Sequence, residues 1–301
     1  MDIAITGASG FIGQALSQSL HRSGHRIAAV SRRAGPDTIT WDPAAGRIDA
    51  AGLEGLDAVV NLAGEPIASA PWTAKQRSRI RDSRQTGTRL LANTLASLQR
   101  PPAVLLSGSA IGAYGDRGDE ILTEAASRGT DFLAEVCRGW EEATDPAERA
   151  GIRVAHLRTG VVLARHGGAL AKQAAIFRLG LGGRAGDGRQ WIPWITLADE
   201  VAAIEFLLGH EIAGPVNVVG PQPSTNAEFT RALGRALHRP TIVRVPGFVR
   251  HVPGGVGDLI HSLLFSSARV VPERLEAAGF SFGVCDLDVA LAAVLAAPRP
   301  S

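Results

Sequence analysis

Tyrosine and lysine are scarce in this chain of 301 residues. Tyrosine occurs once, at Tyr114, and lysine occurs twice, at Lys75 and Lys172, so 29 of the 31 basic residues are arginine. The residue four positions after Tyr114 is Gly118. The sequence therefore excludes a mechanism in which a tyrosine hydroxyl is assisted by a lysine one helical turn further along the chain.

Disulfides, membrane spans and a charge excess are also missing. The two cysteines, Cys137 and Cys285, have no metal-ligand spacing and cannot form a disulfide framework, so we expect no metal site and a reducing compartment. No apolar run reaches 18 residues, and the first residues read as a strand rather than a leader, so we expect a cytoplasmic protein without membrane contact. A net charge of +2 with scattered arginines gives no sign of a nucleic-acid partner.

Short apolar runs alternate with helical patterns in the first half of the chain. The runs cover residues 2–6, 26–30, 57–62, 103–106 and 152–157, and the helical patterns cover 11–21, 73–98 and 132–150. This alternation predicts an α/β fold, a Rossmann-type doubly wound parallel sheet. We expect residues 1–165 to form the nucleotide-binding domain, with 195–222 returning to it. Residues 166–194 and 223–301 are expected to form a smaller C-terminal lobe that holds the substrate.

A glycine-rich turn follows the first predicted strand and opens the first helix. It reads Thr6-Gly7-Ala8-Ser9-Gly10-Phe11-Ile12-Gly13. Gly7 permits the tight turn, Gly10 lets the backbone approach a pyrophosphate, and Gly13 allows close packing of helix and strand. The helix N-terminus adds amide donors for the phosphates. We therefore expect a dinucleotide here, in contact with Thr6, Phe11, Ile12 and the three glycines.

The second predicted strand ends at Ser31-Arg32-Arg33, and no acidic residue follows before Asp37. An acid at this place holds the ribose 2′-hydroxyl of NAD, whereas an arginine suits the 2′-phosphate of NADP. We expect NADP(H), bound by Ser31 and Arg32. The alternative is that these arginines are solvated charges at a strand end.

Two further segments carry a family resemblance. Asp57-Ala58-Val59-Val60-Asn61-Leu62-Ala63-Gly64 and Leu105-Leu106-Ser107-Gly108-Ser109-Ala110 resemble the extended short-chain dehydrogenase/reductase superfamily, its epimerase/dehydratase group. The resemblance implies that Leu62, Ala63, Gly64 and Ser107 line the cofactor and that Ser109 is the catalytic serine. It also implies that Asp57 meets the adenine; a cap between loop and strand is the other role left open for this residue.

The proton donor of that superfamily has no counterpart here. When Glu141 is aligned with the usual helix glutamate, Leu133 falls on the tyrosine position and Cys137 on the lysine position. Neither side chain can supply the missing hydroxyl or ammonium. Tyr114, as the only phenol, is a candidate acid; a bound water or a substrate group are the alternatives.

A narrower resemblance covers nearly the whole chain. It is to the atypical "epimerase family protein" subgroup, which lacks the Tyr-x-x-x-Lys pair and ends in a domain of unknown function. It rests on Ile39-Thr40-Trp41-Asp42, Trp72-Thr73, Ser83-Arg84, Arg158-Thr159-Gly160-Val161-Val162-Leu163, Phe177-Arg178-Leu179-Gly180-Leu181-Gly182-Gly183 and Pro272-Glu273-Arg274-Leu275. The resemblance implies that Arg84 and Val162 touch NADP. It also suggests a homodimer through the long helix 73–98.

These observations leave three functions open. The first is an NADP-dependent oxidoreductase acting on a small carbonyl, alcohol or sugar-nucleotide-like substrate whose oxygen Ser109 holds. The second is a non-catalytic NADP-binding redox sensor or partner-binding protein. The third is a nucleotide-sugar epimerase, which only the superfamily favours.

Overall fold

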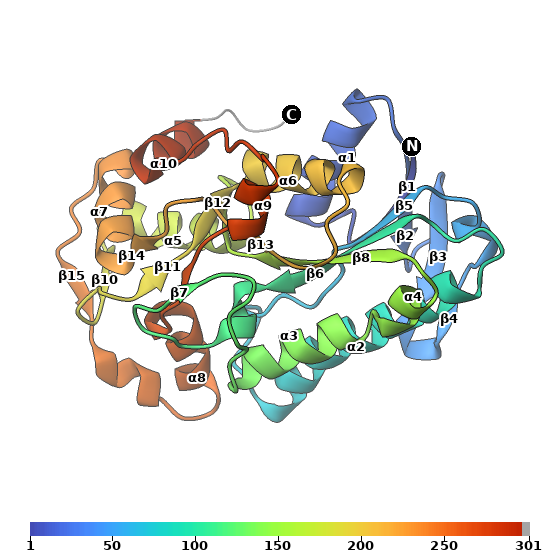
Figure 1. Ribbon diagram of the computed structural model, residues 1–301. Helices are drawn as coiled ribbons and strands as arrows, with labels where there is room; N and C mark the ends of the chain where they lie inside the picture. Colours follow the sequence, from blue (N-terminus) through green and yellow to red (C-terminus); the bar gives the residue numbers. More distant parts are fainter. Residues whose placement is uncertain (297–301) are drawn as a thin grey trace.

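The computed structural model describes residues 1–296, and its centre is one eight-stranded sheet (Figure 1). Neighbouring strands are parallel except the last pair, which is antiparallel. This confirms the expected α/β doubly wound fold of Rossmann type. In spatial order the strands are β13 (Gly214–Val218), β8 (Arg153–Thr159), β6 (Val104–Ala110), β5 (Ala58–Asn61), β1 (Asp2–Thr6), β2 (Arg26–Ser31), β3 (Thr38–Asp42) and β4 (Arg47–Ile48).

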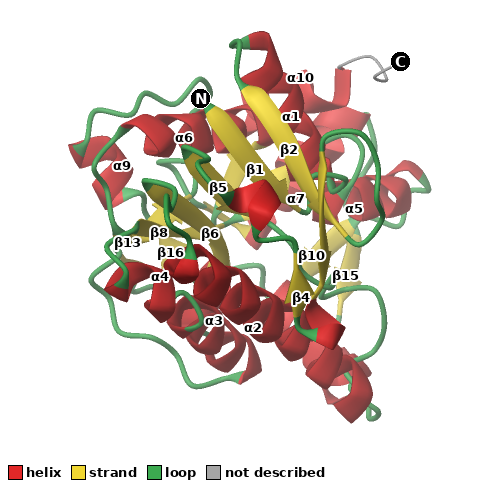
Figure 2. Ribbon diagram, turned by 90° about the vertical axis from the view of Figure 1, so that its right-hand side faces the viewer, coloured by secondary structure: helices red, strands yellow, loops and turns green. Residues whose placement is uncertain are grey.

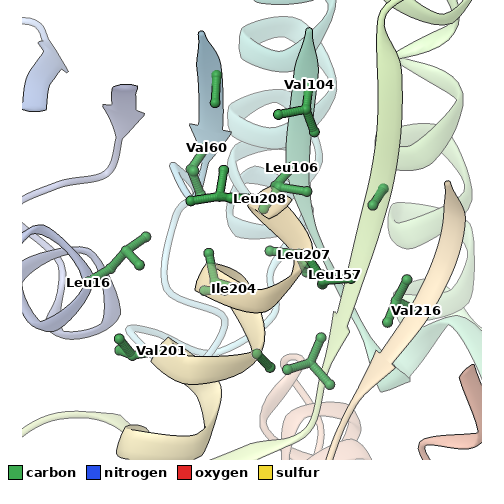
Figure 3. Packing of buried hydrophobic residues seen from close by; sticks show 14 of the residues in the cluster. Leu16, Val60, Val104, Leu106, Leu157, Val201, Ile204, Leu207, Leu208 and Val216 are labelled. Atoms are coloured by element: carbon green, nitrogen blue, oxygen red, sulfur yellow. The ribbon is translucent and has the colours of Figure 1, made fainter. Parts of the chain in front are cut away.

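Helices cover both faces of this sheet, and the two layers can be followed in Figure 2. One face carries α1 (Phe11–Arg22) and α6 (Leu197–Gly209); the other carries α2 (Ala74–Ser97), α3 (Phe132–Glu142) and α4 (Asp145–Arg149). Figure 3 shows how α6 seals the first face, with aliphatic side chains packed against strand residues such as Val60 and Leu157. Burial of these apolar surfaces is the main force that holds the layers together.

The prediction of one long helix over 132–150 is wrong, because this segment forms two helices, α3 and α4. Asp131 caps α3 by accepting a hydrogen bond from the Ala134 amide at 2.9 Å. Pro146 has no N–H to continue the α-helical ladder. The Thr144 hydroxyl instead donates to the Glu141 carbonyl at 2.7 Å, and α4 starts at Asp145.

Helix α2 matches the expected helix over 73–98 and is capped by Thr73, whose hydroxyl accepts from the Gln76 amide. Its apolar residues Ile80, Leu91 and Leu95 are fully buried within the monomer. They are therefore already used by the fold of the single chain. A homodimer through this helix stays a prediction and would have to use the outward, polar face of α2.

A smaller lobe lies beyond the carboxyl ends of the sheet strands (Figure 1). Its apolar cluster joins Phe177, Phe229, Leu233 and Leu291 to Trp194. Its elements are β9 (Val161–Leu163), α5 (Gly168–Arg178), β10 (Gly183–Ala185), β11 (Trp191–Ile192), β12 (Trp194–Thr196), β14 (Ser224–Thr225), α7 (Asn226–Leu237), β15 (Val243–Val245), α8 (Val256–Ile260), β16 (Arg269–Val270) and α10 (Leu287–Ala296). The short helix α9 (Glu273–Ala277) instead returns to the large sheet, where Leu275 joins the core beneath α6. β16 pairs with β7 (Ile121–Leu122).

The segment between the two stretches of this lobe contributes α6 and β13 to the layers of the large sheet. The domain boundaries expected at residues 165, 195 and 222 stay a prediction. Among residues 1–296, no helix combines the length and the apolar character that a membrane crossing requires. Ligands of open parallel sheets bind at the carboxyl ends of the strands, so the candidate site lies between those strand ends and the smaller lobe.

Candidate functional site

The glycine turn between β1 and α1 is built for a close approach by phosphate. Gly7 has φ +69°, and a Cβ there would lie 2.8 Å from the Leu62 carbonyl carbon. A Cβ on Gly13 would lie 2.3 Å from the Gly7 oxygen. Gly10 is exposed, and its side-chain position meets only the Gly7 oxygen, at 3.2 Å. Because no side chain caps α1, its first amides remain available to an anion.

A buried hydrogen-bonded layer supports the strand ends beneath this turn. The Thr6 hydroxyl donates to Asn61 Oδ1 at 2.7 Å and accepts from the Ala63 amide at 3.1 Å. Asn61 Nδ2 donates to Thr88 Oγ1 at 2.8 Å and to Ser107 Oγ at 3.3 Å. Thr6 and Ser107 thus hold the Leu62–Gly64 segment in place through Asn61. Direct contact of either hydroxyl with a cofactor stays a prediction.

The end of β2 presents two arginines to solvent. Arg32 and Arg33 are exposed and form no ion pair with any residue of 1–296. Ser31 Oγ accepts from the Arg33 amide at 3.2 Å and so shapes the turn. Charge at this strand end is therefore uncompensated, as a site for the 2′-phosphate of NADP requires.

Asp57 lies at the amino ends of the central strands, away from the glycine turn. It precedes β5, and its Oδ2 accepts a hydrogen bond from the Asp2 amide at 2.7 Å, where β1 begins. The glycine turn follows the far, carboxyl end of β1. The structure shows Asp57 in the other role left open for it, a cap at the start of β1, while its contact with adenine stays a prediction.

Arg84 reaches from α2 to the segment that follows β5. Its Nη1 donates to the Glu65 carbonyl at 2.9 Å, and its guanidinium lies 4.9 Å from the centre of the Trp140 ring. A Cβ added to Gly64 would lie 3.1 Å from its Cζ. Burial lowers the pKa of Arg84, and no carboxylate within 1–296 forms an ion pair with it. A half-buried cation beside Gly64 is suited to an anionic or oxygen-rich ligand.

Val162, the other residue that the resemblance assigns to NADP, lies in β9 and is 6% exposed. It pairs with Ile195 of β12. Phe11, at the start of α1, packs against the backbone of Gly167, which follows the same strand. The glycine turn and the start of the lobe are thus in contact.

The positions of the missing tyrosine and lysine lie beside the loop after β6. A Cβ on Gly112 would lie 3.1 Å from Leu133 Cβ and 3.9 Å from Cys137 Sγ. Leu133 packs with an apolar cluster that includes Trp72 and Leu259. The Cys137 thiol is 3.7 Å from the Ala110 carbonyl oxygen, and burial raises its pKa to about 11. An apolar side chain and a neutral thiol thus occupy this place.

Ser109 is joined to a buried ion pair at the end of β6. The serine is 6% exposed, and its hydroxyl donates to Glu141 Oε1 at 2.7 Å. Glu141, on α3, accepts from Arg158 Nε and Nη2, each at 2.9 Å, and also from Arg128. Burial by itself would raise the pKa of Glu141, but the hydrogen bonds and charge of Arg158 outweigh it, and the pKa falls to about 2. Glu141 is therefore an ionised acceptor.

The same network continues to the lobe through Tyr114. Arg158 Nη1 donates to the Tyr114 hydroxyl at 3.0 Å, which donates to Asn217 Oδ1 at 2.6 Å. Asn217 Nδ2 donates to the Val271 carbonyl at 2.9 Å. Tyr114 has no exposed surface, and burial raises its pKa. The enclosed hydroxyl connects Arg158 to Asn217, and the candidate role of Tyr114 as a proton donor stays a prediction.

Comparisons with known proteins agree with this geometry. A model of the NAD dependent epimerase/dehydratase family matches residues 3–220. The chain belongs to this family. A second model, a domain of unknown function named DUF1731, matches residues 245–294, within the smaller lobe.

Relatives of this family member match it over nearly its full length. Epimerase family protein Mb2239 of Mycobacterium bovis is 42% identical over 93% of each chain, and human epimerase family protein SDR39U1 is 35% identical over 98% of this chain and 100% of that protein. The crystal structure of human SDR39U1 isoform 2 with NADPH has a TM-score of 0.88 at 33% identity, covering 98% and 99% of the two chains. A nucleoside-diphosphate sugar epimerase from Corynebacterium glutamicum has a TM-score of 0.80 at 36% identity, covering 98% of this chain and 58% of the other.

Three residues of this family member's site were not assigned a role from sequence. Glu141, Arg158 and Asn217 come from α3, β8 and β13, and their contacts depend on how these elements pack. A signal was nevertheless present, because Arg158 directly follows the apolar run expected over 152–157 and lies within β8. A charged residue that is fully buried needs a charged partner, and Glu141 is that partner.

Proposed function

We propose that this protein binds NADP(H) and acts as an oxidoreductase on a small carbonyl or alcohol substrate placed beside Ser109. The glycine turn fits a dinucleotide, because exposed Gly10 brings no side chain between the backbone and a pyrophosphate. When bound, the cofactor supplies the hydride chemistry. The chain's own residues bind its phosphates at α1, orient it along Leu62–Gly64 and hold the substrate oxygen.

The uncompensated charge of Arg32 at the end of β2 carries the proposal of NADP rather than NAD. The structure of human SDR39U1, a relative at 33% identity, contains NADPH and supports the same choice. Val162 and Arg84 would contact the nicotinamide end, since both lie near the segments that follow β5 and β8.

Titration of the protein with NADPH and NADH tests this choice. We expect tighter binding of NADPH, and we expect Arg32→Ala to weaken NADPH binding about tenfold or more while NADH binding changes little, because the lost contact is to the 2′-phosphate alone. Arg79→Ala, on the exposed face of α2, is the matched control and should bind both cofactors as the wild type does. Equal affinities for NADPH and NADH in the wild type would overturn the proposal.

A redox sensor is the second candidate, and the residues at the missing tyrosine and lysine positions favour it. Leu133 cannot donate a proton, and the Cys137 thiol faces the Ala110 carbonyl. A bound water or a substrate group must then supply the proton in an oxidoreductase. Absorbance of NADPH at 340 nm with a broad panel of aldehydes and ketones separates the two. An oxidoreductase consumes NADPH with at least one compound, whereas a sensor binds NADPH and turns over none.

A nucleotide-sugar epimerase is supported by the Corynebacterium glutamicum structure, whose printed name is that of a sugar epimerase. An epimerase would convert UDP-glucose or a similar sugar nucleotide while returning its cofactor unchanged. Proton NMR of UDP-glucose incubated with the NADP-loaded protein distinguishes this outcome. Epimer formation without net reduction of the cofactor would favour it over the oxidoreductase.

A further inference from the structure

The direction of the hydrogen bond at Ser109 follows from the chemistry of its partner. A serine hydroxyl has one proton to donate and two lone pairs that accept. Glu141 Oε1 lies 2.7 Å from Ser109 Oγ, and an ionised carboxylate can only accept. The single proton of Ser109 is therefore directed at Glu141, and only lone pairs remain for another partner.

Glu141 is fixed strongly enough to keep this arrangement. Arg158 binds both of its carboxylate oxygens at 2.9 Å, and Arg128 adds a third hydrogen bond. The Glu141 side chain is 1% exposed and that of Arg158 is 3% exposed, so water competes little. Turning the Ser109 hydroxyl toward a ligand would break a hydrogen bond to a charged group, which is among the stronger kinds in proteins.

We propose that Ser109 accepts a hydrogen bond from the substrate, and that the site therefore selects a substrate bearing a hydroxyl or amine N–H at the reacting carbon over the corresponding carbonyl compound. Glu141 and Arg158 are positioning residues that act through Ser109. The inference deepens the proposed function, on which it rests for the location of the substrate.

The neighbouring residues reinforce this selection. Leu133 brings no polar atom, and the Cys137 thiol, which lies 3.7 Å from the Ala110 carbonyl oxygen and within hydrogen-bond reach of Ser109, has these two partners inside the protein. Tyr114 is enclosed, and its proton goes to Asn217. Apart from the weak S–H donor of Cys137, which already has protein partners, these residues offer a substrate carbonyl oxygen no donor, whereas an alcohol would meet the Ser109 lone pairs as acceptors.

Matched alcohol and ketone pairs test the proposal on the full chain saturated with the redox-inert cofactor analogue 1,4,5,6-tetrahydro-NADP. Cyclohexanol with cyclohexanone, 1-phenylethanol with acetophenone, and glycerol with dihydroxyacetone are suitable probes, followed by ligand-observed NMR. For each pair that binds, the alcohol should bind about tenfold more tightly or better, which is the scale of a hydrogen bond to a charged group. Ser109→Ala should remove this preference, and Ser109→Thr, which keeps a hydroxyl, should retain it.

Glu141→Gln should reverse the preference between alcohol and ketone, which a purely structural role of Glu141 would not do. Its amide N–H can donate to Ser109 Oγ, which frees the serine proton, so the preference should turn toward the ketone. Glu135→Gln, exposed on the same helix, is the control and should leave the wild-type preference in place. If Glu141→Gln does not fold, the comparison of wild type with Ser109→Ala decides alone.

Equal or tighter binding of ketones by the wild type would overturn the proposal. Failure of every pair to show binding that depends on Ser109 would also overturn it. Tight NADPH binding in the same samples would then leave the proposed cofactor function standing, so the two ideas fail separately.

Discussion

Glu200 is a buried acid whose ionisation should be visible in the stability of the protein. It lies on α6 with no exposed surface, and its Oε1 accepts from Thr159 Oγ1 at 2.9 Å. Within the described residues its Oε2 has no hydrogen-bond partner. Burial raises the pKa of Glu200 from 4.5 to about 8, against the opposing effect of the Thr159 hydrogen bond. The folded protein thus keeps a proton that the unfolded chain gives up.

The sign and size of the effect follow from linkage. Because the folded pKa is raised, the stabilisation is complete below about pH 4.5 and is lost as the pH rises to about 8. Each pH unit in that window is worth 1.36 kcal/mol, so the free energy of unfolding should fall by roughly 3 kcal/mol between pH 6 and pH 9 on account of Glu200. Glu200→Gln cannot ionise and should lack this part of the decline.

Urea denaturation at pH 6 and pH 9 measures the difference. Glutamine brings amide protons that lack partners, so the change with pH is the informative quantity rather than stability at one pH. The exposed Glu135→Gln variant should follow the wild type. If Glu200→Gln and wild type lose the same free energy of unfolding between the two pH values, the reasoning about this buried carboxyl is refuted.

Two further predictions concern the site. Gly13→Ala should lower the affinity for NADPH at least tenfold, measured by titration, because its Cβ would lie 2.3 Å from the Gly7 oxygen and the turn must open; unchanged affinity would show that the turn does not bind the cofactor. Tyr114→Phe should lower the free energy of unfolding by about 1–3 kcal/mol, because Arg158 and Asn217 lose a buried partner. Ser17→Ala, which removes a hydroxyl bonded within its own helix, is the control, and an equally small loss in both variants would contradict the network.

The sequence predicted the features of the fold that depend on residues close together in the chain. The glycine turn was predicted correctly because spacing alone sets where a parallel strand must give way to a helix. The break between α3 and α4 was missed, although Pro146 was visible, because the apolar periodicity continues across it. The choice between the two roles left open for Asp57 could not be made from the resemblance, because it gives the segment but not which end of the strand this residue occupies.

The polar network of the site could not be predicted in the same way. The network joins four elements that lie far apart in the sequence: a short 3-10 helix that ends at Tyr114, helix α3 and strands β8 and β13. They contribute Tyr114, Glu141, Arg158 and Asn217. Only the packing of α3 against the sheet determines that Glu141, rather than another acid, accepts the hydrogen bonds of both Arg158 and Ser109. The alignment of Leu133 and Cys137 with the tyrosine and lysine positions and the role of the single tyrosine both stay predictions.

A crystal structure of the protein with NADPH tests the central proposal most directly. The account predicts that the 2′-phosphate lies against the Arg32 guanidinium, the pyrophosphate at the start of α1, and nicotinamide C4 on the side of Ser109, leaving room for a ligand atom at about 3–3.5 Å. A cofactor bound elsewhere, or bound with its 2′-phosphate away from Arg32 and its nicotinamide away from Ser109, would contradict it.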